Sequence, residues 1–159
     1  MSMSKFLLPL SLIVACGPQD ITAAEAVVTA SELTGGTATE ATAVTEDEHD
    51  LWRVEVSMEN SATLEVLLYT DSGKLFEIAD PEGPFDYDLS PLPGLSYADA
   101  QGVAFGEVSG EQRFWEVKDT GERYFYEFYV EDSAAQLWEI KLWADDGEVF
   151  VTEAKSEID

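Results

Sequence analysis

The sequence has very few of the thiol and imidazole side chains that form disulfides or bind zinc. Its 159 residues include one cysteine and one histidine, which leaves no pair of thiols for an internal disulfide and no ligand set for zinc. The histidine, His49, lies among Glu46, Asp47, Glu48 and Asp50 at an expected hairpin turn, and no serine has the glycines of a nucleophile elbow around it. We therefore expect a protein that is not an enzyme and that binds no cofactor.

Basic residues are also scarce. Eight Lys and Arg residues stand against 33 Asp and Glu residues, which gives a net charge of -25. Nucleic acid is excluded as a partner, because phosphate binding needs clustered cations. Anionic lipid is repelled as well, so charge alone does not hold this protein on a membrane. Hydrophobic residues make up 45% of the chain, which is enough for a packed core.

The start of the chain has the pattern of an export signal. Residues 1–15 combine the positive Lys5 with an apolar run that is too short to span a bilayer. The sequence Ile13-Val14-Ala15-Cys16 resembles the bacterial lipobox, in which the cysteine is lipidated and becomes the mature N-terminus. The resemblance implies an extracytoplasmic, lipid-anchored protein, at the outer membrane if the cell is Gram-negative, because Gly17 follows Cys16. The alternative is an ordinary secreted protein that is cut near Ala15.

An internal similarity appears when the chain is shifted by 74 residues. Residues 21–78 then align with 95–152 without a gap, and eleven of these 58 positions are identical, where composition alone gives about four. Each copy begins with a helix N-cap pattern, Thr22 to Glu25 and Ser96 to Asp99. The apolar pattern then predicts a short helix, over about 23–33 and 97–108, followed by four antiparallel strands.

These patterns predict an α+β protein made of two tandem units, each with one helix and a four-stranded antiparallel sheet. The signal peptide occupies 1–15, the first unit 16–78 and the second unit 95–159. Residues 79–94 contain four prolines, which argues against regular strand pairing and predicts an extended acidic linker.

The units resemble the PepSY repeat, in which an Ala-rich helix precedes an antiparallel sheet that ends in a hairpin with Asp and Gly. The residues that carry the resemblance are Ala98, Ala100, Ala104, Gly110, 126–130 and 140–150, with their counterparts in the first copy. A tandem pair is also similar to the beta-lactamase inhibitor proteins, although their disulfides are missing here. The resemblance implies an exported protein that binds another protein, such as an extracytoplasmic peptidase.

A second apolar face is the candidate binding surface. Strand alternation places Leu142, Val130 and Phe150 beneath the helix, and places large apolar residues among charges on the opposite side. The predicted partner-binding residues on that side are Tyr69, Phe114, Phe125, Tyr129 and Trp143. We expect Trp143 and Tyr129 to be more exposed than their neighbours Leu142 and Val130. The alternative is that another part of the chain covers this face.

The linker offers a weaker candidate site. Asp80, Glu82, Asp86 and Asp88 supply oxygen ligands of the kind that calcium prefers, but their spacing does not fit an EF-hand loop. A solvated acidic linker is the alternative. The sequence thus predicts a lipid-anchored protein-binding module of the cell envelope, and an acidic cation-binding or structural envelope lipoprotein is the second hypothesis.

Overall fold

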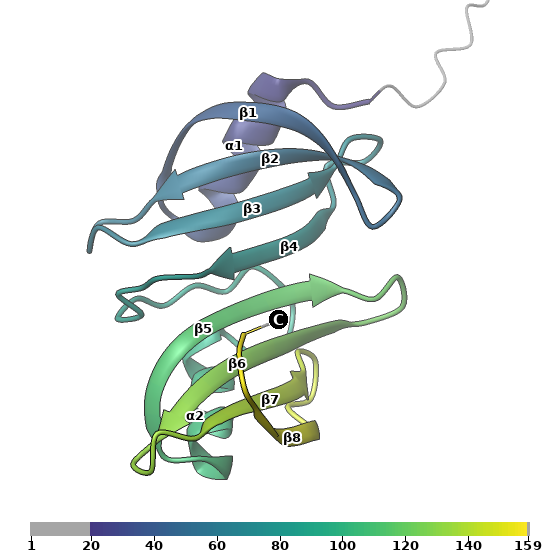
Figure 1. Ribbon diagram of the computed structural model, residues 1–159. Helices are drawn as coiled ribbons and strands as arrows, with labels where there is room; N and C mark the ends of the chain where they lie inside the picture. The colour runs from purple at the N-terminus through teal and green to yellow at the C-terminus, as the bar shows by residue number, and fades with distance from the viewer. Residues whose placement is uncertain (1–19, 159) are drawn as a thin grey trace, which may run out of the picture.

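The computed structural model describes residues 20–158, so the predicted signal peptide and Cys16 lie outside the described residues. Two helices and eight strands follow one another along the chain (Figure 1). The first half contains α1 (Ala23–Thr34), β1 (Thr37–Glu46), β2 (His49–Ser57), β3 (Thr63–Tyr69) and β4 (Leu75–Asp80). The second half contains α2 (Tyr97–Glu107), β5 (Gly110–Asp119), β6 (Tyr124–Asp132), β7 (Leu137–Trp143) and β8 (Val149–Lys155).

All eight strands belong to one antiparallel sheet in the order β1 to β8. The prediction of two separate helix-plus-four-strand units is therefore wrong. β4 pairs with β5, with Glu77 opposite Lys118 and Ile78 opposite Val117. The physical reason is that β4 and β5 would each be an edge with unpaired backbone groups in separate sheets, and pairing them satisfies both edges.

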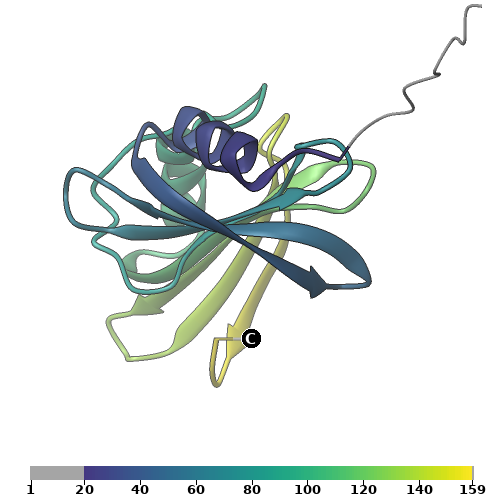
Figure 2. The same cartoon turned by 90° about the horizontal axis from the view of Figure 1, so that it is seen from above.

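Both helices lie on the same face of the sheet (Figure 2). α1 packs mainly against β1 and β2, whereas α2 packs mainly against β7 and β6. The sheet side chains beneath them alternate as a strand period of two requires. The resulting core contains Val54, Val66 and Leu68 in the first half and Tyr126, Phe128 and Leu142 in the second, all fully buried.

The helices begin where the sequence places their caps. The Thr22 side chain accepts a hydrogen bond from Glu25 N, and the Glu25 carboxylate accepts one from Thr22 N at 2.7 Å, which completes a capping box. Ser96 accepts a hydrogen bond from Asp99 N at 3.1 Å at the start of α2. α1 ends at Gly35, whose φ of 73° is the left-handed conformation that glycine adopts without strain.

The segment between the halves is extended but tightly anchored. After Asp80 it forms no strand as far as α2, whereas 79–80 belong to β4. The buried Asp80 carboxylate accepts hydrogen bonds from Gly83 N at 2.7 Å and from the Tyr87 hydroxyl at 2.7 Å. Trp115 Nε1 in turn donates to the Tyr87 hydroxyl at 2.6 Å. These bonds fasten the segment to the helix side of β4 and β5.

Candidate functional site

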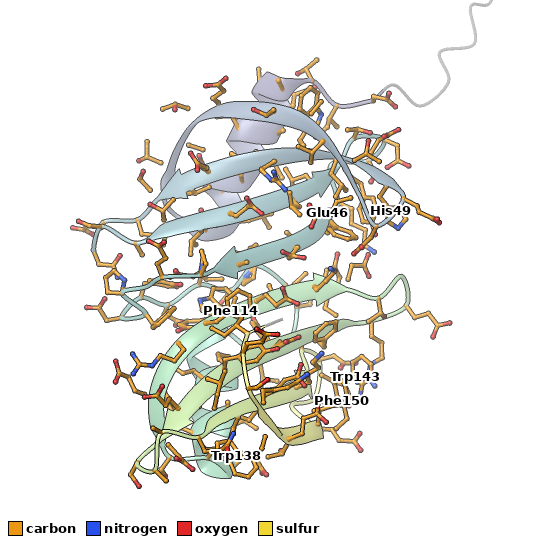
Figure 3. All side chains as sticks on the ribbon, in the orientation of Figure 1. Glu46, His49, Phe114, Trp138, Trp143 and Phe150 are labelled. Atoms are coloured by element: carbon orange, nitrogen blue, oxygen red, sulfur yellow. The ribbon has the colours of Figure 1, made fainter. Side chains whose placement is uncertain are left out.

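The face of the sheet away from the helices, here called the open face, carries all five predicted partner-binding residues. The structure distributes them among three places. Tyr69 packs with His49 and Phe76 in the first half. Phe114 contacts Tyr129 beside the middle of the sheet. Phe125 and Trp143 are brought together as a second pair, through a residue that was expected elsewhere, Phe150. Figure 3 shows Trp143 and Phe150 next to each other and Phe114 apart from them.

Phe125, Trp143 and Phe150 form what we call the aromatic cluster. The rings of Trp143 and Phe150 are stacked with centroids 4.4 Å apart, and Phe125 meets Phe150 edge-on at 6.2 Å. Phe150 is 43% exposed, and it is one of three large hydrophobic residues so exposed among residues 20–158. Phe125 and Trp143 are half-buried. The cluster therefore presents a rigid apolar surface to the solvent.

Charged groups hold the aromatic cluster in place. The Arg123 guanidinium lies 4.3 Å from the centroid of the Trp143 ring, within range of a cation–π interaction. The same guanidinium pairs with Asp145 and with Asp146, the latter at 2.9 Å. On the other side, Lys141 Nζ lies 5.6 Å from the centre of the Phe125 ring. The surface around the rings is thus polar and partly ordered by ion pairs.

Phe150 reaches the open face through a β-bulge that the sequence pattern does not reveal. The pairing between β7 and β8 shifts between Lys141, which is opposite Val151, and Leu142, which is opposite Val149. One additional residue in β8 is accommodated there, and the faces of Val149 and Phe150 are exchanged. Val149 packs against the core, whereas Phe150 joins Trp143. The expectation that Phe150 lies beneath the helix is therefore wrong.

Tyr129 was expected to be exposed, and this prediction is wrong. It is 0% exposed, like its neighbour Val130. Its ring packs edge-on against Phe114, with the centroids 5.8 Å apart, and its hydroxyl donates to Glu139 Oε1 at 3.3 Å. Trp143 is half-buried and more exposed than the buried Leu142, as expected.

A band of carboxylates and lysines separates the aromatic groups. Lys141 Nζ lies 3.0 Å from Glu139 and 3.1 Å from Glu127, and Lys155 Nζ lies 3.3 Å from Glu139. Closer to the first half, Lys118 Nζ lies 3.3 Å from Glu77. Because these lysines each contact carboxylates, most of the buried negative charge in the band is neutralised internally.

Glu116 is the exception in this band. It lies opposite Glu127 on β6 and opposite Ala79 on β4, so that Glu77, which is opposite Lys118, is its diagonal neighbour. Burial, reinforced by the charges of Glu77 and Glu127, raises the pKa of the Glu116 carboxyl to about 8. Burial also raises the pKa of Glu127, even though Lys141 opposes it. The Glu116 carboxyl at the join between the two halves therefore holds at neutral pH a proton that a free glutamate would release.

The acidic residues of the linker anchor the backbone and do not converge on a metal site. Asp80 accepts the bonds described above, Asp86 accepts one from Asn60 Nδ2 at 2.6 Å, and Asp88 accepts one from Ala98 N at 3.1 Å. Glu82 lies exposed beside them. Across residues 20–158, no three Asp, Glu, His or Cys side chains are placed to hold a metal ion. The calcium interpretation of this linker is not supported by its geometry.

His49 occupies the first position of β2 rather than the turn itself. Its ring lies 5.2 Å from that of Tyr69 and 5.6 Å from that of Phe76, measured between centroids. Figure 3 shows it beside Glu46 at the end of the β1–β2 hairpin. With Leu51 and Leu67 nearby, Phe76 belongs to a small buried group on the open face. The role of His49 in the described structure is therefore to pack against the edge of this group.

Comparison with known proteins gives little further guidance. No protein-family model matches the sequence, and no curated protein matches it either. The resemblance to PepSY repeats is thus not confirmed by a family match. Among solved structures, the chain is similar to a "putative lipoprotein" from Clostridium difficile 630, at 14% identity and a TM-score of 0.41, over 91% of this chain and 98% of the other. Such a TM-score is too low to carry an argument about fold or function.

The two helices within residues 20–158 are short, with 12 residues in α1 and 11 in α2. Neither α1 nor α2 is long and apolar enough to cross a bilayer.

Proposed function

We propose that this protein is an exported, lipid-anchored binding module of the cell envelope whose ligand is another protein. The observation that carries the proposal is the aromatic cluster on the open face. Stacked aromatic rings beside an arginine are the composition that dominates the binding energy at protein interfaces. The exposed Phe150 and the cation–π pair of Arg123 with Trp143 provide it on a rigid sheet.

The resemblance of the two sequence copies to PepSY repeats supports an extracytoplasmic enzyme, such as a peptidase, as the class of partner. On this proposal the protein restrains the enzyme by occupying a surface and performs no chemistry itself. The centre of a typical interface is surrounded by a polar rim. Around these rings the rim is supplied by Arg123, Asp145 and Asp146. A partner surface with an apolar pocket rimmed by polar groups fits this arrangement.

Trp143→Ala tests the binding role. Removing an aromatic residue from the centre of an interface costs about 2 kcal/mol or more of binding free energy, so capture of the partner from native envelopes should fall more than about tenfold. The matched control is Trp138→Ala, because Trp138 is a half-buried tryptophan of the same strand on the opposite face. Quantitative mass spectrometry of the captured proteins measures both variants.

The comparison of these variants decides between binding and structural roles. A partner that is lost with Trp143→Ala and retained with Trp138→Ala supports the proposal. Equal capture by all three proteins would contradict it and would favour a structural envelope protein.

The lipid anchor is proposed from the residues Ile13-Val14-Ala15-Cys16. Multiple acyl chains on Cys16 would give stable attachment, which one chain does not. Cys16→Ala should abolish incorporation of a clickable fatty acid and release the protein into the soluble fraction. Cys16→Ser is the closest control for size. Label that persists in either variant would refute lipidation at this position.

A further inference from the structure

The first strand forms a long and unprotected edge of the sheet. β1 has ten residues, and among residues 20–158 it pairs only with β2. Between Glu40 and Glu46 the strand has five residues, 41–45, without a charge or a proline. Natural sheets blunt their edges with charges, prolines, bulges or short strands, because unpaired N–H and C=O groups recruit other strands. The protective features of β1 lie at its two ends, namely a bulge between Ala38 and Ala41 and the charges of Glu40 and Glu46, and residues 41–45 have none.

The opposite edge is built differently. β8 has seven residues and carries Glu153 and Lys155 near its end. Lys155 pairs with Glu139 and Glu153, and Gln136 Nε2 donates to the Lys155 carbonyl oxygen at 3.0 Å. Figure 1 shows β8 turned across the sheet. The edge at β8 is therefore charged and folded inward, so the two edges are not equivalent.

The turn after β1 identifies which backbone groups point to the free edge. Asp47 and Glu48 form a two-residue loop with φ values of 49° and 67°, which is a type I′ hairpin. In such a hairpin the flanking pair, here Glu46 and His49, is the hydrogen-bonded one, and the pairs then alternate along the strands. By this alternation the N–H groups of Ala43 and Thr45 point away from β2. Both residues are exposed.

A groove with acidic walls follows this edge on the open face. It has a volume of about 390 Å³ and is lined by Thr39, Glu40, Thr42, Val44, Arg53 and Glu55. A second hollow of about 380 Å³ adjoins it at Glu55 and includes Glu65 and Glu82. Arg53 is the one basic residue in these linings, and it already pairs with Glu46 at 3.0 Å and with Glu65 at 3.1 Å.

The surplus charge in the groove is negative. Within the described chain Glu40 and Glu55 take part in none of the ion pairs, and both are exposed. An extended chain laid along β1 would place alternate side chains over this groove. Lysine or arginine at those positions would neutralise Glu40 and Glu55. A second copy of this protein does not meet this requirement, because each copy carries a net charge of -25.

From these features we infer that the free edge of β1 docks an extended, basic segment of a partner protein by strand addition. Main-chain hydrogen bonds to residues such as Ala43 and Thr45 provide the affinity, and the acidic groove selects alternating cations. This site is separate from the aromatic cluster, which lies at the other end of the sheet, and it does not depend on the proposed function of that cluster.

A synthetic peptide tests the inference directly. The probe is a ten-residue peptide of alternating Lys and Thr, with a peptide of alternating Glu and Thr as its control. Titration calorimetry with the purified protein should show binding of the basic peptide alone. Hydrogen–deuterium exchange should show new protection of the amides of Ala43 and Thr45, and no change in β8.

Two variants separate strand addition from simple charge attraction. Ala43→Pro removes one outward N–H and should lower affinity at least tenfold, whereas Ala43→Val keeps that N–H and should bind normally. The double variant Glu40→Gln/Glu55→Gln changes only exposed side chains, so the fold is maintained, and affinity should fall severalfold with a weaker salt dependence. Trp143→Ala should bind the peptide normally.

Several results would overturn the inference. Binding without protection at Ala43 and Thr45 would show attraction by charge alone. Unchanged affinity of the Ala43→Pro variant, in a protein whose circular dichroism spectrum shows that it is still folded, would also indicate attraction by charge alone. If these amides are already protected without the peptide, and sedimentation shows that the protein self-associates, the edge would be assigned to a second copy.

Discussion

The two halves of the sheet have the same order of elements but fill their cores in different ways. Each element of the second half begins 73 to 75 residues after its counterpart in the first. At the position 74 residues before Trp115, however, the first half has Ala41. Trp115 is 0% exposed and packs against Tyr97 at 4.4 Å between ring centroids. A small residue and the largest residue thus occupy equivalent places.

The position of the helix explains this difference. α1 packs most closely on β1 and presents the buried small residues Ala26 and Ala30, so little room remains above Ala41. α2 packs on β7 and β6, which leaves the space over β5 to be filled. Trp115 and the linker residue Tyr87 fill it. The comparison teaches that a similar order of elements tolerates a shifted helix when aromatic side chains and an anchored linker replace the lost contacts.

The largest expected effect is that of Trp115→Ala. Removing a fully buried tryptophan costs about 3–5 kcal/mol of unfolding free energy, and it also leaves the Tyr87 hydroxyl without its donor. Because the eight strands form one sheet, the whole molecule should unfold in a single, less stable transition. Urea denaturation, followed by circular dichroism and by the fluorescence of the remaining tryptophans, which lie in both halves, measures this.

Leu68→Ala is the matched change in the first half, since Leu68 is also 0% exposed. It should cost about 2–5 kcal/mol and shift the same single transition. Two separate transitions, each sensitive to one variant, would show that the halves unfold independently despite the pairing of β4 with β5.

Glu116→Gln addresses the join between the halves. Because the folded pKa of Glu116 is raised from 4.5 to about 8, its stabilising contribution is fully present below about pH 4.5 and is lost as pH rises through about 8. The variant should therefore match the wild type at pH 4 and exceed its unfolding free energy at pH 9, by more than about 1 kcal/mol.

Chemical denaturation at a series of pH values provides the test of this difference. Some decline with pH should persist in the variant, because burial also raises the pKa of Glu77 and of Glu127. Parallel stability profiles for the two proteins would rule out a raised pKa at Glu116.

The smallest effects concern the helix N-termini. Thr22→Ala removes the hydroxyl that accepts from Glu25 N, while the backbone N–H of residue 22 can still donate to the Glu25 carboxylate, and should cost about 1 kcal/mol. Ser96→Ala should cost less, because α2 is also held by the buried Tyr97 and by the bond from Tyr97 N to the Leu89 carbonyl at 2.8 Å. Thermal melts of the two variants rank these costs, and the reverse order would mean that packing holds α1 more firmly than α2.

Local features of the fold were predictable from the sequence, whereas non-local ones were not. The helix expected over 23–33 occupies Ala23–Thr34, because the capping residues and alanine spacing act within a few residues. The pairing of Ile78 with Val117 was not predicted, since alternation defines the faces of a strand and not its neighbour. The burial of Tyr129 involves Phe114 on β5 and Glu139 on β7, and no local pattern encodes these contacts between strands.

Part of the candidate site was predictable for the same reasons. Phe125 and Trp143 were assigned to the open face from alternation alone, which holds through β6 and β7. The prediction for Phe150 was wrong because the bulge shifts the register of β8 by one residue and so places the ring on the opposite face. The contacts of Arg123 were not predicted, because the pairing of β6 with β7 is what brings the β5–β6 turn beside Asp145 and Asp146 in the β7–β8 turn.

The bulge beside Lys141 also bears on how this surface can change over generations. In a strand with one additional residue, that residue determines which face of the sheet the neighbouring side chains occupy. Loss of one residue just before Phe150 would place Phe150 opposite Leu142, restore regular pairing between β7 and β8, and turn the ring toward the helices. The fold would retain its eight strands while the exposed aromatic group disappeared. Descendants of one gene could thus gain or lose this contact surface by a three-nucleotide deletion, without any substitution in the core.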